Sequence, residues 1–187
     1  ALPEEAKRFS FVDLQQLEHL YITIYKPMFP EHPYTSSIAL MLQSLDRIKV
    51  GGNYIDFTAP DLQGNPVRLS EQIDGKVALI DLWASWCGPC RMENPNMVKL
   101  YQDFKDKGLA VISVSLDEKK DKWLEAIKKD GLTWLHLSDL KGWTGDVVRL
   151  YNIDAVPTIF VLDENNRIIA KNLRGEKLRA LVSEKLK

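Results

Sequence analysis

The sequence predicts an α/β sandwich with a mostly parallel central sheet and an antiparallel edge, preceded by a helical segment. From about Asn53 onward, apolar runs of strand length alternate with helical patterns. Residues 77–83 and 109–116 are almost entirely apolar, which is typical of central strands covered on both faces. Near the C-terminus, two short apolar runs flank the turn residues 163–166, and this arrangement favours an antiparallel hairpin.

The expected elements follow one another without an internal repeat or a low-complexity segment. We expect strands over residues 67–69, 77–83, 109–116, 134–137, 158–162 and 168–171. We expect helices from the cysteines to about residue 107 and over residues 119–129, 145–151 and 177–186. One face of the first of these helices is apolar, with Met97, Leu100, Tyr101 and Phe104.

Residues 1–50 differ from the rest of the chain in their hydrophobic pattern, which is helical and shows no alternation of strands and helices. Apolar residues recur there at helical spacing: Phe11, Leu14, Leu17, Leu20 and Tyr21. A loop rich in Pro and His follows over residues 29–34, and Thr35, Ser36 or Ser37 is expected to cap a second helix that ends at Gly51-Gly52. We therefore predict a helical lead-in or connector over residues 1–50 and a main domain over residues 51–187.

The composition fits a soluble globular chain of little more than one domain. The 187 residues are 45% hydrophobic and 27% charged, and 25 basic residues against 26 acidic ones leave a net charge of −1. This balance argues against a nucleic-acid partner. The longest apolar run, residues 77–83, is far too short to span a bilayer. No signal peptide is visible at the start of the chain, and a signal removed before residue 1 stays open.

The chain has two cysteines, Cys87 and Cys90, in the pentapeptide Trp86-Cys87-Gly88-Pro89-Cys90. This pentapeptide lies where a buried strand is expected to turn into a helix, so both sulfurs fall on one helix face. The unpaired N–H groups and the dipole of a helix N-terminus favour an anion and lower the pKa of a cysteine placed there. We therefore assign Cys87 as the nucleophile and Cys90 as the cysteine that resolves a mixed disulfide.

Three other interpretations fit the cysteines less well. Two structural cysteines could fall at this spacing by chance, but their place at a strand-to-helix turn argues against it. A structural zinc site needs four ligands, and His19, His32 and His136 show no ligand spacing to one another, so we expect no metal. A peroxidatic cysteine usually follows a Thr or Ser by three residues, and Ala84 holds that position here. We expect dithiol redox chemistry without an organic cofactor.

The chain resembles the thioredoxin superfamily, and within it the extracytoplasmic thiol–disulfide oxidoreductases of TlpA and ResA type. The resemblance covers about residues 50–187 and rests on four pieces in order: residues 56–70, residues 77–90, Arg91-Met-Glu-Asn-Pro95 and Ala155-Val-Pro-Thr-Ile-Phe160. It implies a thioredoxin-like three-layer sandwich with a mixed central sheet, into which this branch inserts a helix and a strand, here over residues 119–137. Residues 1–50 resemble, less specifically, the helical connector upstream of such domains in Bacteroidetes-type proteins.

The resemblance also implies roles for Pro157 and Asp81. In the resembled family the matching proline is cis, lies against the cysteines and follows backbone that pairs with substrate. Without the resemblance, Pro157 would be interpreted as a proline at the start of a strand. An acid in an apolar strand must be paired, protonated or at a position that sees water. The matching thioredoxin acid takes the proton of the buried cysteine, although the lysine that accompanies it falls at Ser113 here. We expect a cis Pro157 and a proton-accepting Asp81.

The remaining site residues follow from their positions beside the cysteines and, for Val156 and Pro157, from the resemblance. Five residues are expected to contact the substrate: Trp86, Gly88, Pro89, Val156 and Pro157. Trp83 is expected in the core. Glu93 lies one turn after Cys90, where the resembled branch often carries an acid, and we assign it a tuning role. A solvated acid near a helix start explains Glu93 equally well.

The leading hypothesis is an enzyme, a protein-disulfide oxidoreductase that exchanges its Cys87–Cys90 dithiol or disulfide with protein disulfides through a mixed disulfide on Cys87. Its partners would be protein disulfide substrates and an unidentified thiol or electron donor. The resemblance alone implies an extracytoplasmic location (periplasm or envelope) and a membrane-anchored context, and we expect a monomer. Two alternatives stay open: a partner-binding module that uses residues 1–50, and a thiol-dependent peroxidase. The direction of electron flow depends on the compartment and the donor.

Overall fold

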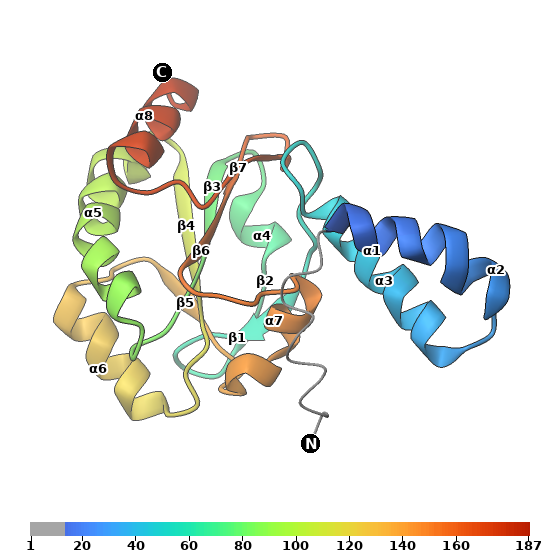
Figure 1. Ribbon diagram of the computed structural model, residues 1–187. Coiled ribbons are helices and arrows are strands. Elements are labelled where there is room, and N and C mark those ends of the chain that lie inside the picture. The colour runs from blue at the N-terminus through green and yellow to red at the C-terminus, as the bar shows by residue number, and fades with distance from the viewer. Residues whose placement is uncertain (1–13) are drawn as a thin grey trace. The chain divides into compact units, whose positions relative to one another are not determined.

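The structure, a computed structural model, describes residues 14–187, and the chain divides into two compact units between Leu45 and Asp46 (Figure 1). The first unit is helical. Its elements are α1 (Leu14–Leu20), the π-helical turn η2 (Tyr21–Tyr25), α2 (Lys26–Met28) and α3 (Pro33–Arg47), which continues past the unit boundary. Helices therefore form where the apolar spacing predicts them, and Phe11 lies outside the described residues.

Two details of these helices differ from the expectation. α3 begins at Pro33 rather than after a cap at Thr35, Ser36 or Ser37, because the fixed φ of proline suits a first helical turn that does not need its N–H. The Ser37 hydroxyl instead donates to the Pro33 carbonyl at 2.9 Å, inside the helix. α3 also ends at Arg47, and Gly51, with φ +90°, lies in the turn beyond it.

The second unit contains a small two-stranded sheet, a five-stranded sheet and helices on both sides of the larger sheet (Figure 1). Its strands are β1 (Thr58–Pro60), β2 (Pro66–Arg68), β3 (Val77–Trp83), β4 (Leu109–Ser115), β5 (Leu135–Leu137), β6 (Thr158–Leu162) and β7 (Ile168–Lys171). Its helices are α4 (Ser70–Ile73), α5 (Gly88–Phe104), η3 (Lys105–Lys107), α6 (Lys120–Asp130), η4 (Gly142–Thr144), α7 (Asp146–Leu150) and α8 (Gly175–Lys185).

The five-stranded sheet is mixed, in the order β5-β4-β3-β6-β7. β3 pairs with β4 and β4 with β5 in parallel, whereas β6 is antiparallel to both β3 and β7. Helices α5 and α8 lie on one side of the sheet and α4 and α7 on the other (Figure 1). This is the three-layer arrangement with a mixed sheet that the resemblance to thioredoxins implies. β3 is the middle strand of the sheet, and every residue from Val77 to Trp83 is buried.

The differences between the expected and the observed elements are confined to short elements and to the ends of helices and strands. β1 was not expected, because a three-residue strand with Pro60 at its end shows no alternation to detect. α4 was not expected either, and α8 begins at Gly175 rather than at Lys177. The predicted core position of Trp83 is confirmed, since only 1% of this residue is exposed. Within residues 14–187, no helix is long and apolar enough to cross a membrane.

Residues 48–53 are tied to the start of β7. Ile48 is only 2% exposed. The Gly51 N–H donates to the Ile168 carbonyl at 2.7 Å, and the Ile168 N–H donates to the Gly52 carbonyl at 2.8 Å. Asn53 forms an isolated antiparallel bridge with Arg167. This short segment therefore extends the β7 edge of the second unit.

We expect the second unit to fold without the first, and we expect Ile48 to contribute to its stability. A chain that begins at Asp46 keeps Ile48, whereas one that begins at Gly51 lacks this buried side chain. Because removing a large buried aliphatic group costs about 2–5 kcal/mol, the shorter chain should be less stable by about 2 kcal/mol in urea unfolding. Equal stabilities would show that Ile48 is not part of this core. A molten chain from Asp46 would show that folding requires the first unit.

Candidate active site

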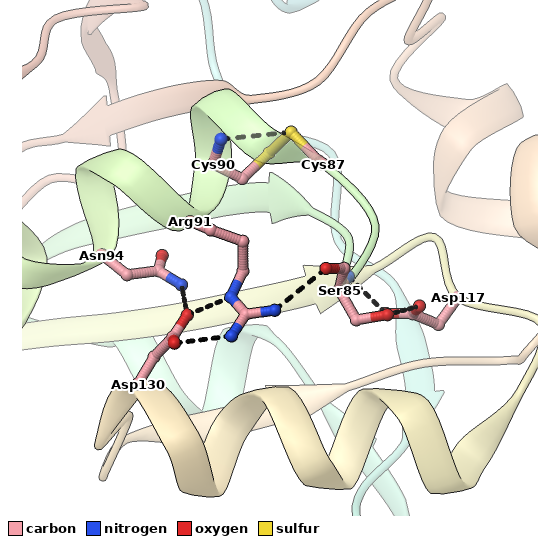
Figure 2. Close-up of polar contacts among 7 residues, drawn as sticks. All are labelled: Ser85, Cys87, Cys90, Arg91, Asn94, Asp117 and Asp130. Carbon is pink, nitrogen blue, oxygen red and sulfur yellow. Dashed lines mark hydrogen bonds and ion pairs between the residues drawn. A yellow bond between two sulfur atoms is a disulfide. The ribbon is translucent and has the colours of Figure 1, made fainter.

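Cys87 and Cys90 form a disulfide where β3 is followed by α5 (Figure 2). Cys87 is the N-cap residue of α5, and the Cys90 N–H donates to its Sγ at 3.2 Å. Pro89 occupies the first turn of α5, where its missing N–H is no disadvantage. Cys87 is 5% exposed and Cys90 2%, while Gly88 and Pro89 between them are exposed. The sulfur of Cys87 therefore lies at a helix N-terminus with a backbone donor directed at it.

The backbone of Ser85, two residues before Cys87, is held from two sides (Figure 2). The Ser85 N–H donates to Asp117 Oδ2 at 2.9 Å, and its hydroxyl donates to Asp117 Oδ1 at 2.5 Å. Arg91 Nη1 donates to the Ser85 carbonyl at 3.0 Å. Asp117 is only 2% exposed and also accepts from the Ser115 hydroxyl at 2.6 Å. A charged group of each sign thus fixes the peptide that leads into the redox motif.

Arg91 is itself fixed by α6. Its Nε and Nη2 both donate to the carboxylate of Asp130, which also accepts from Asn94 Nδ2 at 2.6 Å. Burial opposes the ionisation of Asp130, but the hydrogen bonds from Arg91 and Asn94 outweigh it and hold the pKa of Asp130 below its usual value. The guanidinium therefore joins α5 to α6 and to the loop before Cys87 at once. Sequence patterns assigned no role to Ser85, Asp117 or Asp130, although an acid directly after a buried strand is a recognisable signal.

Asp81 is buried in β3, with 5% of the residue exposed, so it does not face water. It stands opposite Ser113 of β4 in the sheet register, and the Ser113 hydroxyl donates to Asp81 Oδ2 at 2.8 Å. The pKa of Asp81 is raised to about 6, mainly by burial and to a smaller extent by the charge of Glu93, while the Ser113 hydrogen bond and the charge of Arg174 oppose the increase. Ser113 occupies the position where the resembled thioredoxins place a lysine.

Pro157 follows Val156 through a cis peptide bond, as the resemblance implied. Pro157 is buried and Val156 half-buried. The Pro157 carbonyl accepts a hydrogen bond from Arg174 Nη2 at 2.8 Å. Sequence patterns gave no reason to single out Arg174, which precedes α8 by one residue and reaches back 17 positions along the chain.

Glu93 is half-buried and links α5 to the start of α8. Its Oε1 accepts from the Gly175 N–H at 2.8 Å, and its Oε2 accepts from Asn96 Nδ2 at 3.0 Å. Glu93 is therefore not a freely solvated acid. Because Gly175 follows Arg174, one short segment carries contacts to both Glu93 and the Pro157 carbonyl.

Trp86 is 56% exposed and faces Trp143, which is 45% exposed, with 6.2 Å between the ring centroids. The two indoles border a groove of about 540 Å³ whose other lining residues are Ser85, Leu116, Asp117, Glu118, Lys119, Lys122 and Gly142. Sequence analysis placed Trp86 at the surface and assigned no role to Trp143. Within residues 14–187, no group of His, Cys, Asp or Glu side chains is arranged to hold a metal ion.

A thioredoxin-like sandwich with a Cys-Gly-Pro-Cys disulfide at the start of the helix after its central strand defines a thiol–disulfide oxidoreductase. The chain belongs to the AhpC/TSA family, whose model matches residues 50–171. The resemblance to ResA-like proteins is confirmed as well. The chain is 32% identical to the thiol-disulfide oxidoreductase ResA of Geobacillus kaustophilus, over 65% of this chain and 67% of that protein.

Two further similarities agree with this identification. The chain is 38% identical to the thioredoxin-like protein YneN of Bacillus subtilis, over 65% of this chain and 69% of YneN. It also matches the crystal structure of the thioredoxin domain of a thiol-disulfide oxidoreductase from Bacteroides vulgatus, with a TM-score of 0.69 and 35% identity. That match covers 74% of this chain and 99% of the other. Thiol–disulfide exchange, which the sequence motif predicts, is thereby confirmed.

We expect the hydrogen bonds of Asp117 to stabilise the second unit. Asp117→Ala would leave the buried Ser115 hydroxyl and the two half-buried donors of Ser85 without their acceptor. A buried unsatisfied group costs about 1–3 kcal/mol and water can reach a half-buried one, so we expect a loss of about 2–4 kcal/mol in urea unfolding. Asp103→Ala is the matched control, because it breaks only the partly exposed pair with Arg179 and should cost less than about 1 kcal/mol. Similar losses in both variants would contradict a special role for Asp117.

Proposed function

We propose that this chain exchanges its Cys87–Cys90 pair with disulfides of other proteins, with Cys87 forming the mixed disulfide. The observation that carries the proposal is the position of Cys87 Sγ, which caps α5 and accepts the Cys90 N–H. A thiolate at that atom is stabilised by the amide and by the helix dipole. A thiolate is the form of cysteine that attacks disulfides.

The exchange proceeds in two steps. In the first, the Cys87 thiolate attacks a substrate disulfide; its Sγ bonds to one substrate sulfur, the substrate S–S bond breaks, and the other sulfur leaves as a thiolate. In the second, Cys90 gives its proton to Asp81 and attacks Cys87 Sγ, which releases the second substrate thiolate. The substrate disulfide is then reduced and the Cys87–Cys90 disulfide is formed. In the reverse direction, the same disulfide oxidises a dithiol substrate.

The substrate would contact the surface around Cys87. Trp86, Gly88 and Pro89 are exposed beside the disulfide, and Val156 is half-buried before the cis Pro157. Glu93 would tune the site through Asp81, since its charge raises the pKa of that carboxyl. Disulfides of other proteins are the natural substrates of such an open surface, with a separate thiol as electron donor. The resemblance to TlpA and ResA proteins supports an extracytoplasmic, membrane-anchored setting, and we expect the chain to be a monomer.

The first unit is a second candidate for function, as a partner-docking segment. Several of its large apolar residues are well exposed: Ile22, Met28, Phe29, Tyr34 and Leu40. Where exposed apolar side chains gather into one patch, they mark a surface that binds another protein. Comparing insulin reduction by the full chain and by the chain from Asp46 separates the roles. Equal turnover would place the exchange reaction in the second unit and leave the first for docking.

Reduction of insulin disulfides by dithiothreitol tests the proposed activity directly. Catalysed precipitation of insulin chains that disappears in Cys87→Ser supports it. Absence of catalysis together with rapid consumption of hydrogen peroxide would instead support the peroxidase alternative. Ala84, three residues before Cys87, offers no hydroxyl for that chemistry.

We expect the two cysteines to behave differently when each is replaced by serine. Cys90→Ser should accumulate a covalent complex with a disulfide substrate, because the thiol that resolves the mixed disulfide is missing. Cys87→Ser should form no complex and should lose catalysis. Non-reducing electrophoresis and intact-protein mass spectrometry would detect the adduct. An adduct on Cys90 in Cys87→Ser, with none in Cys90→Ser, would reverse the assignment.

Asp81 should make stability fall as the pH rises. Its folded pKa of about 6 lies above the ordinary aspartate value of 3.8, so the folded protein binds this proton more tightly than the unfolded chain does. The resulting stability is fully present below about pH 4 and is lost as the pH rises from about 4 through 6, by about 3 kcal/mol in total. Asp81→Asn cannot ionise, and its unfolding free energy should lack this decrease. Urea unfolding of both oxidised proteins between pH 4 and 8 measures the difference.

The same variant tests the proton-accepting role of Asp81. In stopped-flow reduction of a disulfide substrate, Asp81→Asn should slow resolution of the mixed disulfide and leave the first attack by Cys87 largely unchanged. Unchanged resolution would remove Asp81 from the mechanism. A stability difference that is independent of pH would show that Asp81 does not retain its proton in the folded state.

A further inference from the structure

We propose that Trp134 and Ser113 are positioning residues for Asp81, joined to it by a buried hydrogen-bond chain that orients and polarises its carboxyl group. The proposal rests on the role given to Asp81 in the proposed function. It adds two residues outside the redox motif, on β4 and directly before β5. It also gives a reason why a carboxyl group can change its charge in the middle of an apolar strand.

The three groups form a continuous buried chain. Trp134 Nε1 donates to Ser113 Oγ at 2.8 Å, and Ser113 Oγ donates to Asp81 Oδ2 at 2.8 Å. Ser113 is 0% exposed and Trp134 7%. Asp81 and Ser113 are directly paired in the register of β3 and β4, so the sheet itself sets their separation.

The direction of the chain is fixed by chemistry. An indole N–H can only donate, so the oxygen of Ser113 must accept from Trp134. The single hydroxyl hydrogen of Ser113 is then left for Asp81. Hydrogen bonds in such a chain polarise one another, which makes Ser113 a stronger donor than an isolated hydroxyl. A donor to a carboxylate favours its ionised form, so both residues oppose the effect of burial on Asp81.

Packing holds the indole in the orientation that the chain requires. Trp134 stacks on His136, with 5.6 Å between centroids and 24° between planes. It also meets the edge of Tyr101 at 5.4 Å. His136 pairs with Ser113 in the register of β4 and β5, and burial lowers its pKa to about 4, so it is uncharged at neutral pH. The ring neighbours therefore position the N–H of Trp134 without adding charge to the chain.

The charged groups that act on Asp81 lie on other elements. Glu93 of α5 disfavours the carboxylate, and Arg174, before α8, favours it. On β6, the register partner of Asp81 is Ile159, which does not titrate. Neither Glu93 nor Arg174 contacts Ser113 or Trp134 through a hydrogen bond among the described residues. Replacing a residue of the chain therefore changes the donor to Asp81 and leaves these charges in place.

The test is the pH titration of the Asp81 carboxyl carbon by NMR in the oxidised protein. Ser113→Ala should lower the acid dissociation constant of Asp81 about tenfold, as expected for the loss of a hydrogen bond to a charged group. Trp134→Phe keeps an aromatic ring in the stack and removes the N–H that donates to Ser113. It should therefore lower the acid dissociation constant of Asp81 about threefold. Trp123→Phe is the matched control, because Trp123 is a buried tryptophan whose indole nitrogen has no hydrogen-bond partner among the described residues.

A double variant shows whether the residues act in series. In a Ser113→Ala background, Trp134→Phe should produce no further change, because the connection to Asp81 is already broken. An unchanged titration in Trp134→Phe, or effects that simply add in the double variant, would overturn the proposal. So would a change of similar size in Trp123→Phe.

The wild-type protein offers a measurement that does not depend on the folding of any Ser113 variant. The indole N–H resonance of Trp134, identified by its absence in Trp134→Phe, should titrate with the same midpoint as the Asp81 carboxyl. An indole signal that stays constant across this midpoint would overturn the chain. If the titrations behave as expected but resolution rates stay unchanged in the variants, the hydrogen-bond chain stands and the proton-accepting role of Asp81 falls.

Discussion

Ser85 is bonded through both sides of its backbone, with its N–H on the carboxylate of Asp117 and its C=O on the guanidinium of Arg91. The position of Cys87 depends on this residue, since Cys87 must leave the buried end of β3 and still cap α5. A helix N-terminus can stabilise a thiolate only if the sulfur stays within reach of the free amides. The ion pair between Arg91 and Asp130 extends the same constraint to α6, so that three separate segments determine where the sulfur lies.

The site combines groups that stabilise the fold with one that weakens it. Asp117 and Asp130 are buried or half-buried carboxylates surrounded by donors, and their charges are compensated where they lie. Asp81 has a single hydroxyl donor and remains costly to ionise. A carboxyl group whose pKa lies near the working pH can both accept and release a proton. A carboxylate whose charge is stabilised by several donors is less suited to that task. Stability and chemistry are thus divided among different acids.

The sequence was informative wherever a pattern is local. The apolar runs of β3 and β4, the hairpin of β6 and β7 and the cysteine pair at a strand-to-helix turn are all visible within a few residues. The contacts that complete the site are not, because Arg91 and Asp130 lie 39 positions apart and Ser85 and Asp117 lie 32 apart. Trp134 looked like an ordinary apolar strand residue, since nothing in the sequence shows that its N–H meets Ser113. Nothing in the sequence singled out Arg174, because its contact with Pro157 depends on the turn before α8.

The segment before α8 has a consequence for the order of events during synthesis. The Gly175 N–H donates to Glu93 and Arg174 donates to the Pro157 carbonyl, so two contacts of the site come from residues that are synthesised well after the cysteines. At about 5–20 residues per second, a ribosome reaches Arg174 roughly 4–17 s after it has added Cys87. During this interval the nascent chain carries both thiols without the segment that later contacts Glu93 and Pro157. A newly made molecule therefore passes through a period in which both thiols are present before the contacts of Glu93 and Pro157 with this segment have formed.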